Sequence, residues 1–376
     1  MLDAFIASPP ALIVATGILV GTASALLGTF LVLRGKSMLT DAISHSILFG
    51  IVMVWLVTSQ TEGVIQIIGA ALTGLLTVAL TQGLSRTRLM RDDAAIGLVF
   101  PALFAVGIVL LNVYARNVHI DQHTVLLGEI SFVWLDTAEV GGRNVPVALL
   151  VLLPMTLVNL AFVLAFYKEL KLSSFDPGLA AALGFLPGLL GYALLALVSA
   201  TAVAAFDAVG VILFLAFVIV PASAAYLLTD RLWLMLVMAS VIAILSAILG
   251  YLLAVRVNVS IGGMMALVTG VFFVLAFLFG PRHGLIAQWA VRRAQAKRNE
   301  TRTLVAHLYN HEATAGESEE NVTRALIEHL GWNRQKARAI VLRGLDLALV
   351  HRQGHLLALT ELGRAEARAI LEPWRG

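Results

Sequence analysis

Two ionisable side chains, Asp41 and His45, lie four residues apart in a stretch that is otherwise apolar. This spacing places both on one face of a helix. The helix continues into the uncharged run Ser46–Val57, which is typical of a membrane span. Because an ionisable group in hydrocarbon is costly, such groups usually face a protein interior or an aqueous path. A carboxylate and an imidazole also make a suitable ligand pair for a divalent transition metal.

The alternative for this pair is a structural role, in which the two side chains tie membrane helices together. We favour the functional interpretation, because ionisable groups inside membranes are functional by default. At a rise of about 1.5 Å per residue, Asp41 would lie only about 6–10 Å into the span from the cytoplasmic side. The pair is therefore predicted to contribute metal ligands near the cytoplasmic end of a path.

The composition places most of the chain in lipid. The 376 residues are 59% hydrophobic and 13% charged, with a mean hydropathy of +0.90. A soluble protein carries about twice that charged fraction. The chain has no cysteine, which excludes disulfides, thiolate ligands and thiol catalysis.

Nine runs without charge are long enough to cross a bilayer. The chain is therefore predicted to be an all-α polytopic membrane protein. Gly178–Phe206 exceeds one perpendicular span, so its first part is expected outside the bilayer. The runs are Ala11–Leu33, Ser46–Ser59 extended back through Asp41, Val64–Leu84, Ala94–Tyr114, Val145–Tyr167, Gly178–Phe206, Ala208–Leu228, Leu232–Val255 and Ile261–Gly280.

Lys and Arg residues are concentrated on alternate connections between these runs, and this asymmetry sets the orientation in the membrane. The N-terminus is expected outside the cell membrane and the C-terminus in the cytoplasm. Residues 1–10 lack the basic segment of a cleavable signal, so the first span is expected to be retained. The connections poor in basic residues hold only Arg116, Arg143 and Arg256.

The composition changes abruptly after Gly280. Residues 1–284 are predicted to form the transmembrane domain and the basic residues 285–300 a helical linker. Residues 301–376 predict a cytoplasmic domain with helices near 302–311, 319–330 and 334–345, a hairpin turning at Gly354, and a last helix capped by Thr360. This order of elements is that of a small α+β winged-helix domain.

A short cytoplasmic helix is predicted after Asp176-Pro177, since the carboxylate caps free amides and proline fits the first turn. Gly184 is a suitable stop. The helix suits either a solvated connector or docking into a groove on another protein, and composition alone does not choose between them. Its apolar side chains would be exposed beside one another at Phe175, Leu179 and Leu183.

Several segments, in order along the chain, resemble the permease subunits of manganese/zinc/iron-type ABC importers. The likeness covers roughly residues 11–284. The segments are Gly28-Thr-Phe-Leu-Val-Leu-Arg34, Asp41-Ala-Ile-Ser-His45, Leu172-Ser-Ser-Phe-Asp-Pro-Gly-Leu-Ala180, Ala208-Val-Gly-Val-Ile-Leu213 and Pro221-Ala-Ser-Ala-Ala-Tyr-Leu-Leu-Thr-Asp-Arg231.

The resemblance implies a type II importer fold in which two permeases, identical or related, form the path. Two ATPases would dock on a cytoplasmic coupling helix, and an external binding protein would deliver the metal. Asp41 and His45 match a motif that the family uses along its metal path. The coupling residues would be Phe175, Asp176, Pro177, Leu179, Ala180, Leu183 and Gly184.

The chain itself is not expected to be an enzyme. Gly28 and Gly35-Lys36-Ser37 suggest a phosphate loop, but six residues separate the glycines, whereas that loop has four. ATP hydrolysis must therefore come from a partner subunit. No permanently bound cofactor is expected, since the metal ion is the substrate.

Three further acids are weaker candidates for the metal path. Asp207 separates two apolar runs and either faces the path or caps the external start of the following helix, which we favour. Asp121 and Glu129 lie on family-like external segments. They would either guide cations or be ordinary solvated loop acids.

The C-terminal domain resembles the winged-helix region of metal-dependent repressors at 349–351 and 359–367. Its third helix has positive charge suited to DNA, but such charge fits any solvated helix, and we favour a protein-interaction or regulatory module over DNA binding. His307 and His311 have the spacing of metal ligands; two ligands alone make a weak site, and we favour surface histidines. The basic residues are Arg334, Lys336, Arg338 and Arg343.

The sequence thus predicts the membrane subunit of an ABC importer for a divalent transition metal. Manganese is expected first, with zinc or iron next, because Asp and His accept all three. The alternative is an ion-gradient-driven secondary metal carrier with a cytoplasmic sensor domain. Such carriers often show inverted repeats, and we find no convincing repeat. A third interpretation, a membrane-bound transcription regulator, would require residues 301–374 to bind DNA.

Overall fold

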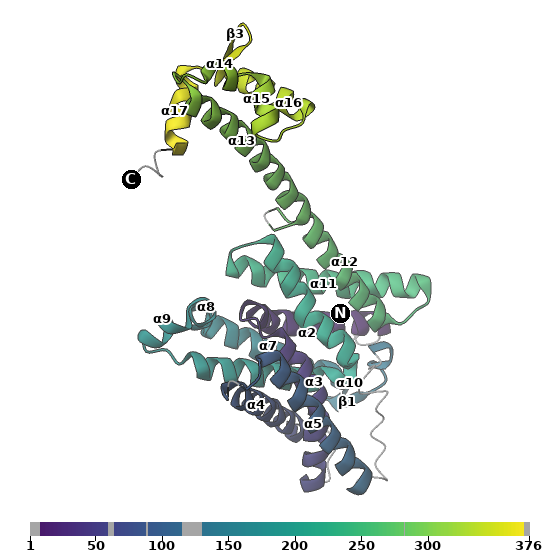
Figure 1. Cartoon of the computed structure of the whole chain (residues 1–376). Coiled ribbons are helices and arrows are strands. Elements are labelled where there is room, and N and C mark those ends of the chain that lie inside the picture. The colour runs from purple at the N-terminus through teal and green to yellow at the C-terminus, as the bar shows by residue number, and fades with distance from the viewer. Residues whose placement is uncertain (1–7, 59–63, 88, 115–129, 282, 372–376) are drawn as a thin grey trace. The chain divides into compact units, whose positions relative to one another are not determined.

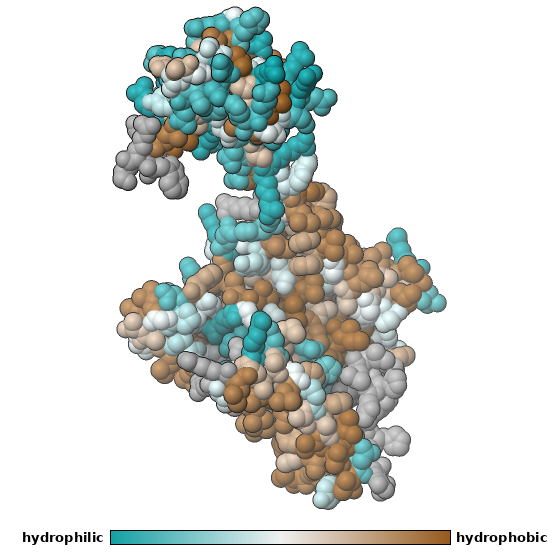
Figure 2. Space-filling model, in the orientation of Figure 1, coloured by the Kyte–Doolittle hydropathy of each residue, from teal (hydrophilic) through white to brown (hydrophobic). Residues whose placement is uncertain are grey.

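The computed structural model describes residues 8–58, 64–87, 89–114, 130–281 and 283–371. The chain forms two compact units, Met1–Gly284 and Leu285–Gly376, which are considered separately (Figure 1). Both are mainly helical. On the face shown in Figure 2, the first unit is largely hydrophobic and the second largely hydrophilic.

The first unit is built from long apolar helices. Eight helices among the described residues are long and apolar enough to cross a membrane, which confirms a polytopic, mostly helical membrane protein. They are α2 (Pro9–Leu33), α3 (Ser37–Thr58), α4 (Val64–Arg86), α5 (Asp92–Tyr114), α7 (Val147–Ala165), α10 (Pro187–Leu228), α11 (Leu232–Val257) and α12 (Ile261–Phe279).

Helix α10 consists of two helical segments that meet at Gly210. Its 42 residues would extend about 63 Å if straight, twice the hydrocarbon core of a bilayer. The backbone leaves the helical region at Gly210, with φ 76° and ψ 168°, and glycine adopts such a positive φ at little cost. The rings of Phe206 and Phe214 are 5.5 Å apart, whereas eight residues rise about 12 Å in a straight helix. The chain therefore turns sharply here.

Contacts with α2 show that the second segment of α10 runs back alongside the first. A Cβ at Gly191 would lie 3.2 Å from Nη1 of Arg34, which follows α2. Six residues earlier on α2, a Cβ at Gly28 would overlap the carbonyl oxygen of Val218. In a straight helix, residues 191 and 218 would be about 40 Å apart. The turn at Gly210 thus gives two antiparallel segments, which correspond to two of the nine predicted apolar runs, whereas the described residues contain eight candidate spans.

Helix α2 lies at the centre of the unit, in contact with α7, α10 and α11. Its small residues let neighbouring helices approach closely, as is usual for helices that pack in lipid. A Cβ at Gly21 would lie 3.1 Å from that of Ala243 on α11, and one at Gly17 would lie 3.2 Å from that of Ala247. Helices α3 and α5 pack against each other and position the candidate ligands.

Shorter elements connect the spans. Before α7, the described part of the connection contains η1 (Ile130–Phe132) and an antiparallel hairpin of β1 (Thr137–Val140) and β2 (Arg143–Pro146), with Thr137 opposite Pro146. After α7 come α8 (Tyr167–Phe175) and α9 (Pro177–Ala182). Because α9 and α10 are separate, the first part of the overlong run from Gly178 lies outside the following span.

The second unit has helices α13 (Leu285–His311), α14 (Glu317–Glu320), α15 (Thr323–His329), α16 (Arg334–Asp346) and α17 (Glu361–Leu371), with strands β3 (Val350–Gln353) and β4 (Leu356–Leu359). The strands pair antiparallel around Gly354 (φ 63°). Asn333 caps α16 by accepting from Lys336 N at 2.8 Å. Apolar side chains from all the longer elements form one buried core, including Leu304, Leu308, Trp332, Ile340 and Leu357.

The linker and the first helix of the domain are both helical, as expected, and are continuous with each other in α13. One expectation for this unit is wrong. The single helix expected at 319–330 is divided into α14 and α15, because Val322 is extended and forms a β-bridge with Leu356. Asn321 O also accepts a hydrogen bond from Leu357 N at 2.8 Å. Pairing with the hairpin therefore interrupts the helix.

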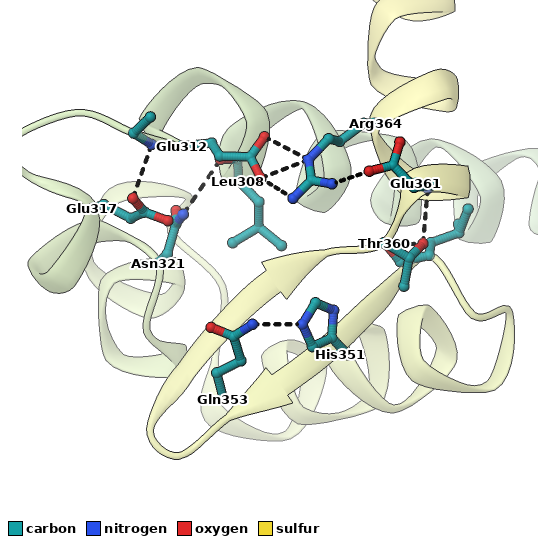
Figure 3. Close-up of polar contacts among 12 residues, drawn as sticks. Leu308, Glu312, Glu317, Asn321, His351, Gln353, Thr360, Glu361 and Arg364 are labelled. Carbon is teal, nitrogen blue, oxygen red and sulfur yellow. Dashed lines mark hydrogen bonds and ion pairs between the residues drawn. The ribbon is translucent and has the colours of Figure 1, made fainter.

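Ion pairs tie α17 to the end of α13 (Figure 3). Arg364 Nε donates to Oε1 of Glu312 at 2.9 Å, and its Nη1 donates to Oε1 of Glu361 at 2.6 Å. Thr360 caps α17, as expected: Gly363 N donates to its Oγ1 at 3.0 Å. The pair with Glu312 thus joins α17 to the residue that follows α13, whereas the pair with Glu361 lies within α17.

Candidate functional site

Asp41 and His45 form a pair on one face of α3. The distance from His45 Nε2 to Asp41 Oδ1 is 3.5 Å, and the two side chains are 35% and 41% exposed, His45 first. The His45 ring stacks on Phe100 of α5, with centroids 5.6 Å apart and planes at 27°. Phe104 meets the same ring edge-on at 6.5 Å. The aromatic rings therefore orient the imidazole while the pair remains open to a surface of this single chain.

A cavity lies beside the start of the same helix. Its volume is about 320 Å³, and its walls come from the ends of α2, α3, α4 and α5. Met38 lines the cavity, and Met38, Asp41 and His45 follow at helical spacing along one face of α3. Its polar walls include Lys36, Gln82, Ser85 and Asp93. Asp41 and His45 thus lie one and two helical turns along α3 from Met38 in the wall of this cavity.

The other candidate acids are not brought to this pair. A Cβ at Gly74 of α4 would lie 2.5 Å from Ser199 Cβ and 3.4 Å from Ile43 Cγ2, so residue 199 of α10 lies level with Ile43. Asp207 is exposed and comes eight residues later on α10, about 12 Å further along the helix. Asp121 and Glu129 lie outside the described residues. Among the residues that are described, no third imidazole or carboxylate joins Asp41 and His45 in a metal-binding cluster.

The short helix predicted after Asp176 is present as α9. Leu179 N donates to Asp176 Oδ1 at 2.9 Å, and Pro177 occupies the first turn. Gly184, with φ 86°, ends the helix in the left-handed conformation. Ala180 is fully buried and anchors the helix to the unit, whereas the apolar side chains around it are exposed: Phe175 60%, Leu179 47% and Leu183 61%.

Sequence reasoning missed the residue that fixes this region. Arg34, directly after α2, donates to Ser173 and Ser174 of α8. Burial lowers the pKa of Arg34 from its ordinary value, although the guanidinium stays charged. Arg34 and both serines stand in the family-like segments, but nothing in the sequence pairs residues so far apart.

The long apolar helices, the Asp41–His45 pair on α3 and the exposed apolar side chains around α9 are features suited to a membrane transport subunit. Residues 10–280 match the ABC 3 transport family (ABC-3). The chain therefore belongs to this family.

Named relatives agree with the match. The chain is 49% identical over 277 residues to the manganese transport system membrane protein MntD of Bacillus subtilis (strain 168), covering 73% of this chain and 94% of that protein. It is 42% identical over 361 residues to the zinc transport system membrane protein TroD of Treponema pallidum (strain Nichols), covering 96% and 98%. The likeness to TroD is long enough that it must extend into the second unit.

A solved structure also resembles the membrane unit. It is described as PsaBC from Streptococcus pneumoniae in complex with Fab, and it matches with a TM-score of 0.62 and 28% identity. The alignment covers 75% of this chain and 98% of the other.

Proposed function

We propose that this chain is the permease subunit of an ABC importer for a divalent transition metal. Membership of the ABC 3 transport family over residues 10–280 is the observation that carries this proposal. Manganese is the first candidate and zinc the second, since the relatives are named for these two ions. Iron is the third candidate substrate, because Asp and His side chains also bind iron. A gradient-driven carrier has no support from the family match.

In the proposed mechanism, Asp41 and His45 each give one ligand atom to the passing ion. An oxygen and a nitrogen ligand suit manganese and zinc, and two protein ligands per chain hold an ion weakly enough to release it. Water or a second permease, identical or related, would complete the coordination. Asp207, exposed about two turns further along, is a weaker candidate for an earlier position on the path, as are Asp121 and Glu129.

Coupling to ATP hydrolysis is assigned to the segment from Phe175 to Gly184. A cytoplasmic ATPase would receive Phe175, Leu179 and Leu183 in a groove, since exposed apolar side chains on a short rigid helix make suitable anchors. The chain supplies no catalytic residue to ATP hydrolysis. An external metal-binding protein would deliver the ion to the opposite face. This places the N-terminus outside the cell membrane and the second unit in the cytoplasm.

For the second unit we propose a winged-helix-like interaction or regulatory module. The order of its helices and its hairpin supports this, and so does the use of its basic residues. Lys336 Nζ lies 2.9 Å from Glu300 Oε1, and Arg343 Nη1 lies 3.7 Å from Glu300 Oε2. Because these cations on α16 already face an acid on α13, DNA is the less favoured partner.

Reconstitution tests the proposal directly. Proteoliposomes should contain this permease with its partner ATPase, and the external binding protein should be added with radioactive manganese. We expect manganese to accumulate only when ATP is present on the side of the membrane that holds the ATPase. Excess zinc should inhibit this manganese uptake. Uptake by the permease alone, driven by an ion gradient, would instead establish the carrier alternative.

A further inference from the structure

The second unit brings two imidazoles and one carboxylate to a single point. His307 and His311 lie one turn apart at the end of α13, and Glu320 ends α14. One ligand atom from each of the three lies within 4.8 Å of the other two. No other trio of His, Cys, Asp or Glu in the part of the chain that the structure describes is gathered in this way. The sequence alone favours ordinary surface histidines at these two positions. The carboxylate beside them makes a metal site the better interpretation.

The spacing is close to that of a bound ion. His307 Nε2 lies 3.9 Å from Glu320 Oε2, and the rings of His307 and His311 have centroids 4.7 Å apart, tilted by 50°. Ligand atoms about 2.0–2.1 Å from a tetrahedral zinc ion are about 3.3 Å from one another. His307 Nε2 also lies 3.2 Å from the backbone oxygen of Glu320, a contact that ion binding at this nitrogen would replace.

A neighbouring histidine holds the carboxylate in place. His329, at the end of α15, has its Nδ1 2.6 Å from Glu320 Oε2. Metal-bound carboxylates are usually oriented by such an outer hydrogen bond. The His307 side chain is only 9% exposed and that of Glu320 24%.

The local charge also favours a cation. The end of α13 presents the negative end of a 27-residue helix dipole, and α14 is an acidic turn of sequence Glu-Ser-Glu-Glu. Two arginines of this unit are paired with other acids: Arg364 binds Glu312, and Arg324 binds Glu328 at 2.9 Å.

From this geometry we infer that His307, His311 and Glu320 bind one divalent transition-metal ion, with a water in the fourth position and His329 supporting the carboxylate. Two imidazoles and one carboxylate favour zinc over manganese, since manganese is the weakest binder of its series. The second unit would then carry a metal site separate from the path ligands on α3. If the unit is cytoplasmic, as the proposed function requires, this site meets ions after they cross the membrane and suits a sensor of import.

The test is metal binding by the purified full chain in detergent, which needs neither ATPase nor transport. The background is Asp41→Ala with His45→Ala, which removes the predicted path ligands. Equilibrium dialysis with zinc, followed by elemental analysis, should give one ion per chain. His311→Gln and Glu320→Gln should each weaken this binding by at least about tenfold. Cobalt bound in place of zinc should lose its visible absorption bands in the same variants.

The matched control is His351→Gln with His355→Gln, two histidines of the same unit on or next to the β3–β4 hairpin. This control should bind zinc as the background does. Thermal unfolding without metal should be the same for all variants, and zinc should raise the unfolding temperature of the background and control only. Zinc binding that survives His311→Gln and Glu320→Gln, or a background that binds no zinc, would overturn the inference. Either result leaves the transport proposal unaffected.

Discussion

Arg34 at the end of α2 donates from Nη2 to Ser173 Oγ on α8 at 2.7 Å, across 139 residues of sequence. Its Nε donates to the next hydroxyl, that of Ser174, at 3.0 Å. Helix α8 leads directly into α9, the proposed contact of the ATPase. One side chain therefore links the central helix of the membrane unit to the coupling segment.

Replacing Arg34 by Ala should loosen this link. Hydrogen bonds from a charged group are worth about 1.5–3 kcal/mol, so the variant should unfold at a lower temperature in detergent and ATP-driven uptake should fall several-fold. Thermal unfolding and uptake in proteoliposomes measure the two effects. Arg91→Ala, which removes an exposed arginine between α4 and α5, is the control and should change neither. Unchanged uptake with Arg34→Ala would remove the proposed coupling role.

Replacing Leu179 and Leu183 by Ser should prevent ATPase binding. Central apolar anchors of an interface contribute about 2 kcal/mol or more, so affinity should fall by at least about 30-fold. Co-purification of the ATPase with a tagged permease measures this loss. Because both side chains are exposed, the permease itself should fold normally. The control is Leu89→Ser, at a leucine outside α9 that is 84% exposed, and this variant should still bind the ATPase. Loss of ATPase binding in both variants would mean that α9 has no special role.

Replacing Gly28 by Ala should destabilise the membrane unit. The new Cβ would overlap the carbonyl oxygen of Val218, and backbone cannot move aside as a side chain can. We expect a loss of about 3 kcal/mol, the upper end for overpacking, measured as thermal unfolding in detergent. Gly83→Ala on α4 is the matched control, because nothing lies within 4 Å of its Cβ, and it should be neutral or slightly stabilising. Equal stability of the two variants would contradict the close packing of α2 and α10.

Much of the fold could be predicted because membrane spans depend on local composition. Long apolar runs give the helices directly, and Asp176, Pro177 and Gly184 give both ends of α9 through capping rules. The apolar pattern predicts a break between the two segments of α10 at Asp207, three residues before the turn at Gly210. The charge marks the interruption of the apolar pattern, whereas the turn needs the residue that tolerates a positive φ.

Contacts between distant segments could not be predicted in this way. The link from Arg34 to Ser173 depends on how α2 and α8 meet, and the arrival of Glu320 beside His307 depends on the loop after α13. The division between α14 and α15 follows from pairing of Val322 with Leu356, which no local pattern indicates. Helix propensity favours one helix there, and tertiary pairing overrides it.

The most direct test of the account is ATP-driven manganese uptake by the reconstituted importer carrying Asp41→Ala and His45→Ala. Uptake should fall by more than about tenfold, since even outer partners of metal ligands commonly contribute that much. The matched control is Asp230→Ala with His283→Ala, a second Asp–His pair at 3.0 Å outside the spans, which should retain uptake. Wild-type uptake by the Asp41 and His45 variant, with ATPase binding intact, would contradict the proposed path.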